Sequence, residues 1–316
     1  MSEGKLLITV TVNPAVDKSA WVERVVREDK LRCRDPRSDP GGGGINVSRV
    51  LTRLGGKTLA VYCAGGFVGE KLRKLLSRES VPEKRVEISE ETRENLTVIE
   101  TPRGHQYRFG MPGPRLSEEE VRRALDAPFE GPEKPDWIVG SGSLPPGVTE
   151  DFYARLGRRA RDAGVRFAVD TSGSALAATL DAEPTLIKPN LRELANLVGR
   201  ESLEDREVGR EARRLASEGK ARYVVVSLGS GGAVVATSDG WNRLRAPTVP
   251  AKSRIGAGDS MTAAMVLRLA AGASIVDAAR YGIAAGSAAV ITEGTELCRE
   301  EDVERLYASL TEGAGG

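Results

Sequence analysis

The sequence predicts an α/β fold, in which helices flank a mostly parallel central sheet and a small second sheet stands beside it. Short apolar runs rich in β-branched residues alternate with longer amphipathic helical patterns, and this alternation is typical of parallel sheets covered on both faces. Two segments interrupt the alternation with strand-like patterns and no long helix, and they predict the second sheet. The whole of residues 1–316 is interpreted as one domain that contains both sheets.

The apolar runs are expected to form buried strands of the large sheet. They cover residues 6–12, 58–64, 136–141, 165–170, 184–189 and 222–228. Amphipathic helices are expected at residues 68–79, 149–164, 191–200 and 207–220, and alanine-rich helices at 257–274, 275–294 and 300–310. Ligands of such sheets bind beyond the carboxyl ends of the strands, so functional residues should follow these runs.

The two interrupting segments, residues 16–38 and 94–110, are expected to form a small antiparallel sheet outside the main one. This sheet is interpreted as a lid over a site or as a contact between subunits. The alternative is a pair of ordinary surface hairpins. His105 lies in the second segment and is interpreted as a turn residue, because it lacks the spacing of a catalytic triad or a zinc motif.

Composition disfavours several classes of function. The 46 Lys and Arg side chains nearly balance the 45 Asp and Glu side chains, and aromatic residues make up only 4% of the chain. Nucleic-acid binding is therefore not expected, because a basic surface and stacking platforms are missing. No apolar run approaches the ~20 residues of a membrane span, so no membrane contact is expected. The three cysteines lack paired spacing, which fits a reducing cytoplasm.

Two common phosphate-binding motifs are disfavoured. The stretch "LTRLGGKT" (51–58) contains the Gly-Lys-Thr of a Walker A loop, but Leu51 stands where that loop needs glycine. Gly55 and Gly56 are interpreted instead as the C-terminal cap of a helix. No G-x-G-x-x-G follows a strand, which disfavours a nicotinamide dehydrogenase.

The stretch "RIGAGDSMTAAMVLRL" (254–269) carries the strongest chemical signal. Gly256, Ala257 and Gly258 lead into a helix, whose backbone N–H groups and dipole would form a hole for an anion. Asp259 would compete with that anion unless it takes a proton from an attacking hydroxyl while the hole holds a transferring phosphoryl group. An unperturbed aspartate is ionised at neutral pH, so this role needs no shifted pKa. The alternative role for Asp259 is an N-cap.

This stretch resembles the signature of ribokinase-like sugar kinases, and further motifs match the phosphofructokinase B family in order. They are "TVNPAVD" (11–17), "GGGGINVSRVLTRLGG" (41–56), "KPNLREL" (188–194) and "VVVSLGSGGAVV" (224–235). The segments most similar to the 6-phosphofructokinase members are "KLRC" (30–33), "QYRFGMPG" (106–113), "SGSLPPGV" (141–148) and "GTELC" (294–298). Gly43 stands where 1-phosphofructokinases and tagatose-6-phosphate kinases often carry lysine. The resemblance implies a ribokinase-like fold and an ATP-dependent phosphorylation of fructose 6-phosphate, with those two other activities as alternatives.

The resemblance also implies which residues contact the phosphosugar. Those that would hold its hydroxyls are Asp17, Gly41, Gly42, Asn46 and Ser143. Carboxylate and amide groups suit vicinal hydroxyls, although Asp17 alone fits a strand-end cap and Asn46 an N-cap equally well. Arg93 and Arg108 would bind the substrate phosphate, which the arginine fork suits. As isolated residues, these two arginines are ordinary surface charges.

For the nucleotide, the resemblance implies Mg²⁺-ATP. The residues on this side would be Lys30 (from a neighbouring subunit), Lys188, Asn190, Ser227, Gly229, Gly231 and Gly232. Asn190 and Glu193 are three apart and would share one helix face, and Glu193 would hold magnesium through water. Without the resemblance, "SLGSGG" (227–232) is a plain hairpin turn.

A potassium ion and a second subunit complete the implied assembly. Relatives expose oxygens to a monovalent cation at the positions of Ser253 and Ile255, but Arg254 replaces a frequent threonine, which leaves the potassium site open. The lid segments would join two copies into a homodimer. A non-catalytic sugar-phosphate sensor on the same fold is disfavoured, because a sensor needs no general base such as Asp259.

Overall fold

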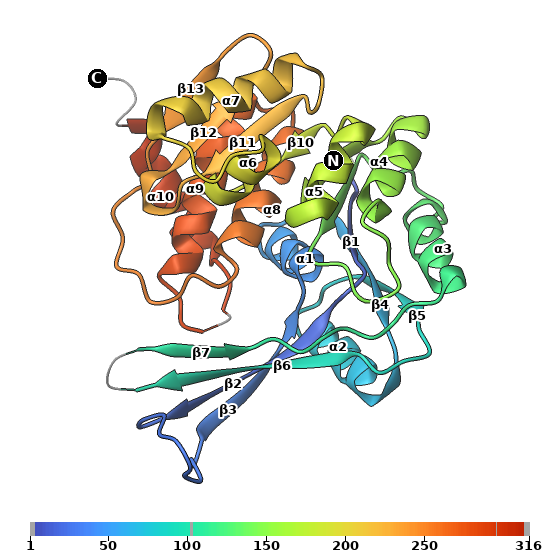
Figure 1. Cartoon of the computed structure of the whole chain (residues 1–316), viewed down its shortest axis with the longest axis vertical. Coiled ribbons are helices and arrows are strands. Elements are labelled where there is room, and N and C mark those ends of the chain that lie inside the picture. The colour runs from blue at the N-terminus through green and yellow to red at the C-terminus, as the bar shows by residue number, and fades with distance from the viewer. Residues whose placement is uncertain (1–3, 102–103, 295, 313–316) are drawn as a thin grey trace.

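The structure is a computed structural model that describes residues 4–101, 104–294 and 296–312. Within these residues the strands form two sheets (Figure 1). The larger sheet has nine strands in the order β13-β12-β11-β10-β9-β8-β1-β4-β5, and the smaller has four in the order β3-β2-β6-β7. No helix in these ranges is long and apolar enough to cross a membrane.

The larger sheet contains all six strands expected from the apolar runs. Its strands are β1 (Leu7–Thr11), β4 (Thr58–Ala64), β5 (Glu83–Glu87), β8 (Trp137–Ser141), β9 (Arg166–Asp170), β10 (Leu186–Ile187), β11 (Tyr223–Ser227), β12 (Ala233–Ala236) and β13 (Trp241–Leu244). Every pairing from β5 to β11 is parallel. Only the pairings β11–β12 and β12–β13, at one edge, are antiparallel, and short connections replace crossover helices there. The predicted mostly parallel sheet is confirmed.

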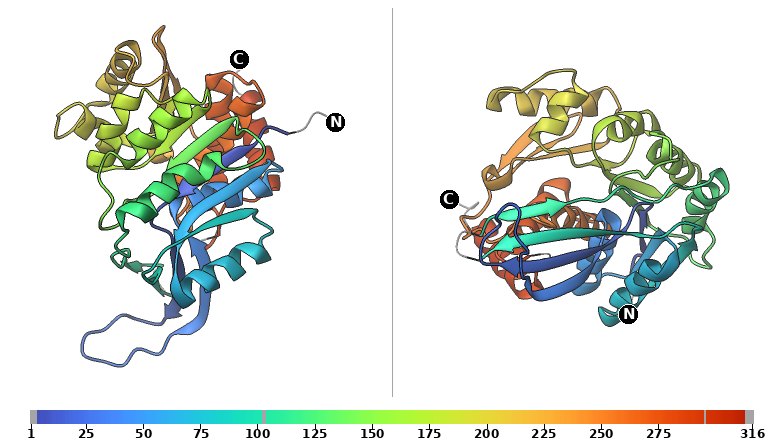
Figure 2. Two further views of the ribbon diagram at one scale, coloured as in Figure 1. Left: turned by 90° about the vertical axis from the view of Figure 1, so that its right-hand side faces the viewer. Right: turned by 60° about the horizontal axis from the view of Figure 1, so that its bottom comes forward.

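Helices cover both faces of this sheet, as successive side chains of a buried strand require (Figure 2). Ile8 and Val10 of β1 pack into one apolar cluster, and Leu7 packs into the other. Helices with side chains in the first cluster are α3 (Glu118–Asp126), α4 (Phe152–Asp162), α5 (Gly173–Thr179), α6 (Leu191–Leu197) and α7 (Asp205–Ser217). Helices with side chains in the second are α1 (Gly43–Arg53), α8 (Ala257–Ala270), α9 (Ile275–Val290) and α10 (Glu300–Glu312).

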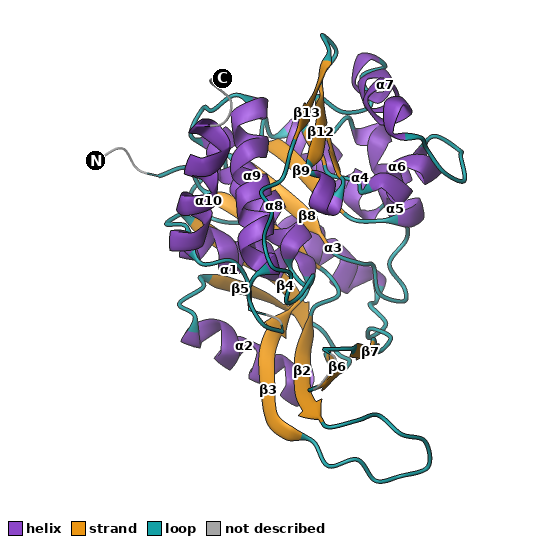
Figure 3. Cartoon of the chain, turned by 90° about the vertical axis from the view of Figure 1, so that its left-hand side faces the viewer, coloured by secondary structure: helices purple, strands orange, loops and turns teal. Residues whose placement is uncertain are grey.

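The smaller sheet projects from the larger one (Figure 3). Its strands are β2 (Ala15–Val22), β3 (Arg34–Gly41), β6 (Arg93–Glu100) and β7 (Gln106–Phe109), and α2 (Gly66–Arg78) packs between the two sheets through Leu72 and Leu76. The predicted antiparallel arrangement is only partly correct. The pairs β2–β3 and β6–β7 are antiparallel, but β2 and β6 are parallel. They pair in parallel because α1, β4, α2 and β5 lie between them in the chain and provide a long crossover.

Two smaller interpretations are confirmed. Gly55 follows α1 with a φ of +73°, and the N–H of Gly56 donates to the carbonyl of Leu51 at 2.8 Å, which is a C-terminal cap and not a phosphate loop. His105 lies exposed in the connection from β6 to β7, of which residues 102–103 lie outside the described residues.

Candidate active site

Asp259 lies where α8 begins, next to the carboxyl ends of the parallel strands. The N-cap of α8 is Gly256, whose φ is +73° and whose added Cβ would lie only 2.3 Å from Cδ2 of Leu297. This position therefore requires glycine. The N-cap alternative for Asp259 is wrong, because Gly256 takes that place. Asp259 instead accepts a hydrogen bond from Nδ2 of Asn46, at 2.9 Å.

The carboxyl group of Asp259 is buried among other charges. Burial, together with the nearby carboxylates of Asp170 and Asp17, raises its pKa to about 6, although Asn46 and Lys188 act in the opposite direction. The assumption of an unperturbed pKa for Asp259 is therefore corrected. An aspartate with a pKa near 6 remains ionised at neutral pH and is a stronger proton acceptor than an ordinary aspartate.

Lys188 and Asp170 form a buried ion pair beside the start of α8. The Nζ of Lys188 lies 3.2 Å from Oδ2 of Asp170, and Thr262 of α8 donates to the same oxygen at 2.7 Å. Burial alone lowers the pKa of Lys188, but Asp170, Asp259 and Glu193 together raise it, so the ammonium stays charged. A Cβ added to Gly258 would lie 3.3 Å from this Nζ, which places the positive charge against the glycine turn.

Asn190 and Glu193 form a reciprocal capping box at the start of α6. The N–H of Glu193 donates to Oδ1 of Asn190, and the N–H of Asn190 donates to Oε2 of Glu193, both at 2.9 Å. Asn190 is therefore the N-cap of the helix. The prediction that Asn190 and Glu193 share one helix face is wrong, because Asn190 lies before the first helical residue. Burial, together with the charge of Asp170, raises the pKa of Glu193.

Magnesium is the metal that this pair of carboxylates suits. In the described ranges, no group of three or more His, Cys, Asp or Glu side chains is arranged to hold a metal ion by itself. Magnesium usually binds one or two carboxylates, several waters and the phosphates of a nucleotide. Asp170 and Glu193 match that requirement.

A set of polar side chains is linked to Asp259 through Asn46 and Asp17, and we call it the polar flank: Asp17, Asn46, Arg93, Asn95 and Ser143. Asn95 donates to Oδ1 of Asp17 at 2.8 Å across the β2–β6 pairing, and Asn13 donates to Ser143 at 3.0 Å. Its hydrogen-bonding groups are thus already oriented.

Glycines 41 to 44 close the polar flank because side chains would not fit there. A Cβ on Gly41 would lie 2.3 Å from Oδ2 of Asp17. Gly42 is the N-cap of α1 with a φ of +115°, so the N-cap alternative for Asn46 is wrong. A Cβ on Gly43 would lie 2.3 Å from Oγ of Ser141 and 2.9 Å from N of Gly142. A lysine at this position would therefore require the backbone at 141–142 to move.

The two predicted phosphate-binding arginines differ in their surroundings. Arg93 is half-buried and donates from Nη1 to the carbonyl of Met111 and from Nη2 to that of Asn13, both at 3.0 Å. Arg108 is exposed in β7. It pairs with Thr97, on the face of the sheet that carries Asp17, because Thr97 and Asn95 are two residues apart. Lys30 is exposed in the connection between β2 and β3.

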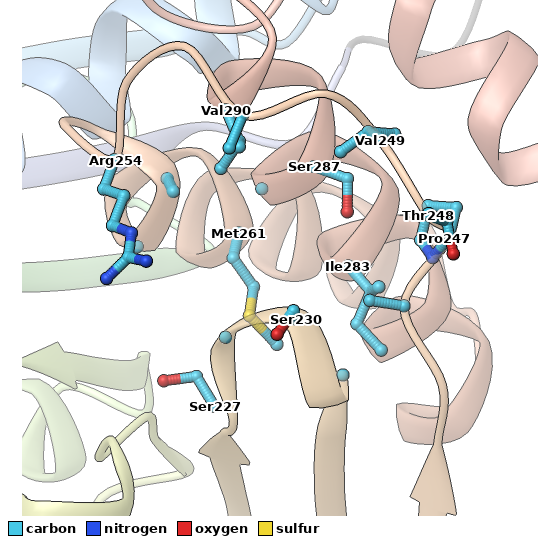
Figure 4. A pocket seen from close by; sticks show the side chains of 17 residues that line it. Ser227, Ser230, Pro247, Thr248, Val249, Arg254, Met261, Ile283, Ser287 and Val290 are labelled. Carbon is cyan, nitrogen blue, oxygen red and sulfur yellow. The ribbon is translucent and has the colours of Figure 1, made fainter. Parts of the chain in front are cut away.

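A cavity of about 370 Å³ lies between the turn after β11 and helices α8 and α9, and we call it the α8–α9 cavity (Figure 4). Its lining includes Ser227, Gly229, Gly232, Val249, Arg254, Gly258, Met261, Ile283 and Val290. Figure 4 shows Ser230 next to the end of the Met261 side chain, which extends from α8. The "SLGSGG" stretch is a hairpin connection, as the alternative predicted, and it also forms one wall of the cavity.

The arrangement of a buried carboxylate, a glycine turn and a neighbouring cavity agrees with the family comparison. The sequence of residues 9–302 matches the protein family described as pfkB family carbohydrate kinase. The chain belongs to this family. It is therefore a phosphotransferase that acts on a sugar hydroxyl. Its fold is shared by Arabidopsis thaliana ribokinase, whose structure has a TM-score of 0.75 at 18% identity over 96% of this chain and 98% of that one.

Relatives within the pfkB family cover nearly the whole chain. The ATP-dependent 6-phosphofructokinase isozyme 2 of Escherichia coli is 43% identical over 96% of this chain and 99% of its own length. The 1-phosphofructokinase of Bacillus subtilis is 30% identical over 96% of this chain and 98% of its length. Structures of Escherichia coli phosphofructokinase-2 in complex with fructose-6-phosphate, in complex with potassium and in a tetrameric inhibited form have TM-scores of 0.91, 0.93 and 0.91, at 42% identity over 97% of this chain and 99% of theirs.

In this pfkB kinase, the structure brings together most of the residues predicted from sequence. Asn46 donates to Asp259, and the charges of Asp17 and Lys188 both act on its carboxyl group. Of the other predicted residues, Lys30 and Arg108 are exposed, and Gly231 is not among the residues that line the α8–α9 cavity. Ser253 donates to the carbonyl of Gly294 at 2.7 Å and accepts from the N–H of Ile255 at 3.2 Å, just before the glycine turn.

Asp170 is the main site residue that the sequence reading missed. It ends the buried strand β9, at the sheet edge where ligands of parallel sheets bind. That position was a usable signal. Asn13, Asn95 and Arg49 were also missed, because their partners are distant in sequence. The β1–β8 pairing brings Ser143 near Asn13, the second sheet brings Asp17 near Asn95, and the packing of α2 brings Glu79 near Arg49.

Proposed function

We propose that this chain is an ATP-dependent 6-phosphofructokinase, which transfers the γ-phosphoryl group of ATP to the C1 hydroxyl of fructose 6-phosphate. The observation that carries the proposal is the buried Asp259 carboxylate, held by Asn46 between the polar flank and the α8–α9 cavity. The higher identity to a 6-phosphofructokinase than to a 1-phosphofructokinase supports this phosphosugar. The reaction is a step of glycolysis, and its proposed setting is the cytoplasm.

Asp259 acts as the general base. It takes the proton of the C1 hydroxyl, and the freed oxygen forms a bond to the γ-phosphorus while the bond to the β–γ bridging oxygen breaks and ADP leaves. The backbone N–H groups at Gly256, Ala257 and Gly258 stabilise the charge that develops on the phosphoryl oxygens. Lys188 adds a fixed positive charge beside Gly258.

The binding roles follow from the two sides of Asp259. Residues proposed for the sugar and its phosphate are Asp17, Gly41, Gly42, Asn46, Arg93, Arg108 and Ser143. Residues proposed for ATP are Lys188, Asn190, Ser227, Gly229, Gly231 and Gly232. Magnesium would be held by Glu193, through water, and by Asp170, and it would supply charge neutralisation on the nucleotide phosphates.

Two further parts of the proposal concern potassium and assembly. A potassium complex of a relative supports a monovalent cation near Ser253 and Ile255. One copy would join another through the lid strands, within residues 16–38 and 94–110, so that Lys30 reaches the partner's site. The tetrameric form of a relative is compatible with this dimer, because symmetric tetramers are commonly built from two-fold contacts.

A substrate panel tests the proposal. ADP release is measured with Mg²⁺-ATP and, in turn, fructose 6-phosphate, fructose 1-phosphate, tagatose 6-phosphate and unphosphorylated sugars. We expect the highest kcat/KM with fructose 6-phosphate. Preference for tagatose 6-phosphate or fructose 1-phosphate would replace the assigned substrate but keep the kinase. Tight binding of a sugar phosphate without any ADP release would overturn the kinase assignment in favour of a sensor. The Asp259→Asn variant is the control for contaminating activity.

A further inference from the structure

Arg49 is a buried arginine one helical turn after Asn46 in α1, with 2% of its surface exposed. Its Nε and Nη2 donate to the carboxylate of Glu79, the C-cap residue that follows α2, at 2.6–3.0 Å. Its Nη1 donates to the carbonyl of Pro40 at 3.0 Å and to Oδ1 of Asn46 at 3.1 Å. A chain of hydrogen bonds thus runs from Glu79 through Arg49 and Asn46 to Asp259.

The direction of this chain is determined by chemistry. A guanidinium group carries only donors, so the oxygen of the Asn46 amide must face Arg49. The NH₂ group of that amide is then the end that faces Asp259, and it can only donate. Without Arg49, the amide is free to turn its oxygen toward the Asp259 carboxylate, and two acceptors would then oppose each other.

We propose that Arg49, held by Glu79, is a positioning residue that fixes the Asn46 amide so that its NH₂ group donates to Asp259. The inference rests on the proposed role of Asp259 as general base. Arg49 does not touch the reacting atoms; it acts only through Asn46.

A neighbouring arginine separates this role from that of an ordinary ion pair. Arg53, one turn further along α1, also binds Glu79, at 3.0 Å, and its other nitrogen donates to the carbonyl of Leu297 at 3.2 Å. Both arginines therefore contribute charge to the same carboxylate, but only Arg49 contacts Asn46. If the ion pair with Glu79 only joined α1 to α2, loss of Arg53 and loss of Arg49 should have the same effect on the enzyme.

The charges that face Asp259 come from several elements and predict the consequence of losing Arg49. Asp17 of β2 and Asp170 of β9 disfavour its ionised form, while Lys188 and the Asn46 amide favour it. If the amide no longer donates, we expect the pKa of Asp259 to rise by about one unit. Asp259 would then be protonated in a larger part of the working pH range.

The test is the pH dependence of kcat for Arg49→Met, with Arg53→Met as the matched control. Relative to the parent enzyme, Arg49→Met should lose about five-fold in kcat at pH 6 and about two-fold at pH 7, with the loss disappearing above about pH 8, where the base is ionised in both proteins. In Arg53→Met, the fall of kcat at acidic pH, which we call the acidic limb, should occur at the same pH as in the parent enzyme. An equal loss at every pH in Arg49→Met, or the same shift in both variants, would overturn the proposal.

A second variant separates positioning from folding. Arg49→Met leaves Glu79 with one partner fewer, so Arg49→Met/Glu79→Gln removes both charges and should restore the thermal midpoint. We expect its acidic limb to remain shifted, because Asn46 still lacks its donor; a return of the limb to the parent position would sink the idea.

A measurement that needs no turnover keeps this inference separate from the proposed function. The ¹³Cγ shift of Asp259, assigned by comparison with Asp259→Asn, is titrated in the parent protein and in Arg49→Met. A higher titration midpoint in Arg49→Met supports the positioning role whatever the substrate panel shows. Identical midpoints would refute that role even in an active kinase.

Discussion

The polar flank contacts Asp259 through Asn46, the α8–α9 cavity is lined by its neighbours Ala257 and Gly258, and the two regions differ in how they are built. On the polar flank, hydrogen bonds of 2.8–3.0 Å already join Asn95 to Asp17, Asn46 to Asp259 and Asn13 to Ser143. The cavity, in contrast, is lined mainly by small and apolar side chains, and Arg254 is the charged side chain among its lining residues.

This difference indicates that the polar flank determines which sugar binds, whereas the cavity tolerates small changes in its lining. Buried polar groups that are already oriented reject a ligand whose hydroxyls do not match, since unmatched groups stay unpaired. An apolar cavity binds by shape and area, so each contact contributes a small and graded amount. We therefore expect large, sugar-specific effects on the polar flank and small, nucleotide-specific effects in the cavity.

The largest effect is expected at the boundary of the two regions. In Asp259→Asn, the side chain keeps an oxygen that can accept from Asn46 but loses the ability to take a proton. We expect kcat to fall by ~10²–10⁴, with KM for both substrates changed only modestly. Steady-state kinetics of ADP release measure this change. Near-normal turnover would mean that Asp259 is not the base.

The next effect concerns the substrate phosphate. Arg93→Ala should raise KM for fructose 6-phosphate by ~10–100-fold, because a guanidinium–phosphate contact is charge-assisted and partly shielded from water. KM for ATP should stay within about two-fold, since no cavity contact is changed. Arg108→Ala serves for comparison, and we expect a smaller rise because Arg108 is exposed. An unchanged KM in Arg93→Ala would remove that residue from the site.

Sequence and structure agree most where one local pattern decides the outcome. The strand ending at Asp170 and the helix starting at Ala257 were readable from apolar periodicity and glycine placement. The parallel pairing of β2 with β6 was not readable, because it depends on how the chain crosses over between them. For the same reason the sequence did not connect Arg49 to Glu79, which lie 30 residues apart.

The shifted pKa of Asp259 was also beyond the sequence. An isolated aspartate in a helix has no reason to depart from its usual pKa. The shift arises because the fold buries this carboxyl and brings Asp170 and Asp17 near it from two different strands. The sequence around Asp259 cannot predict that these like charges come close to it in the folded chain.

That shift has a consequence for stability. The pKa of Asp259 is about 6 in the folded protein and near 3.8 when unfolded, so ionisation of this residue opposes folding. Asp259→Asn should therefore raise the free energy of unfolding by about 1–3 kcal/mol above pH 6. The gain should shrink as the pH falls below 6, where the folded-state acid becomes neutral, and it should vanish only below about pH 3.8, where the acid is neutral in both states. Denaturant unfolding at pH 4, 5, 6 and 7.5 measures it; a gain that does not depend on pH would contradict the electrostatic origin.

The smallest effect is expected in the cavity and completes the comparison. Val249→Ala removes two methyl groups from the wall of the α8–α9 cavity, and each buried methylene-sized group contributes about 0.8 kcal/mol. KM for ATP should rise by about 3–10-fold, while KM for fructose 6-phosphate and kcat stay close to the parent values. Val276→Ala is the matched control, because Val276 packs against the same apolar cluster without lining the cavity. A rise in KM for the sugar in Val249→Ala would mean that the two regions do not bind their ligands independently. An equal rise in KM for ATP in both variants would mean that the effect does not come from the wall of the cavity.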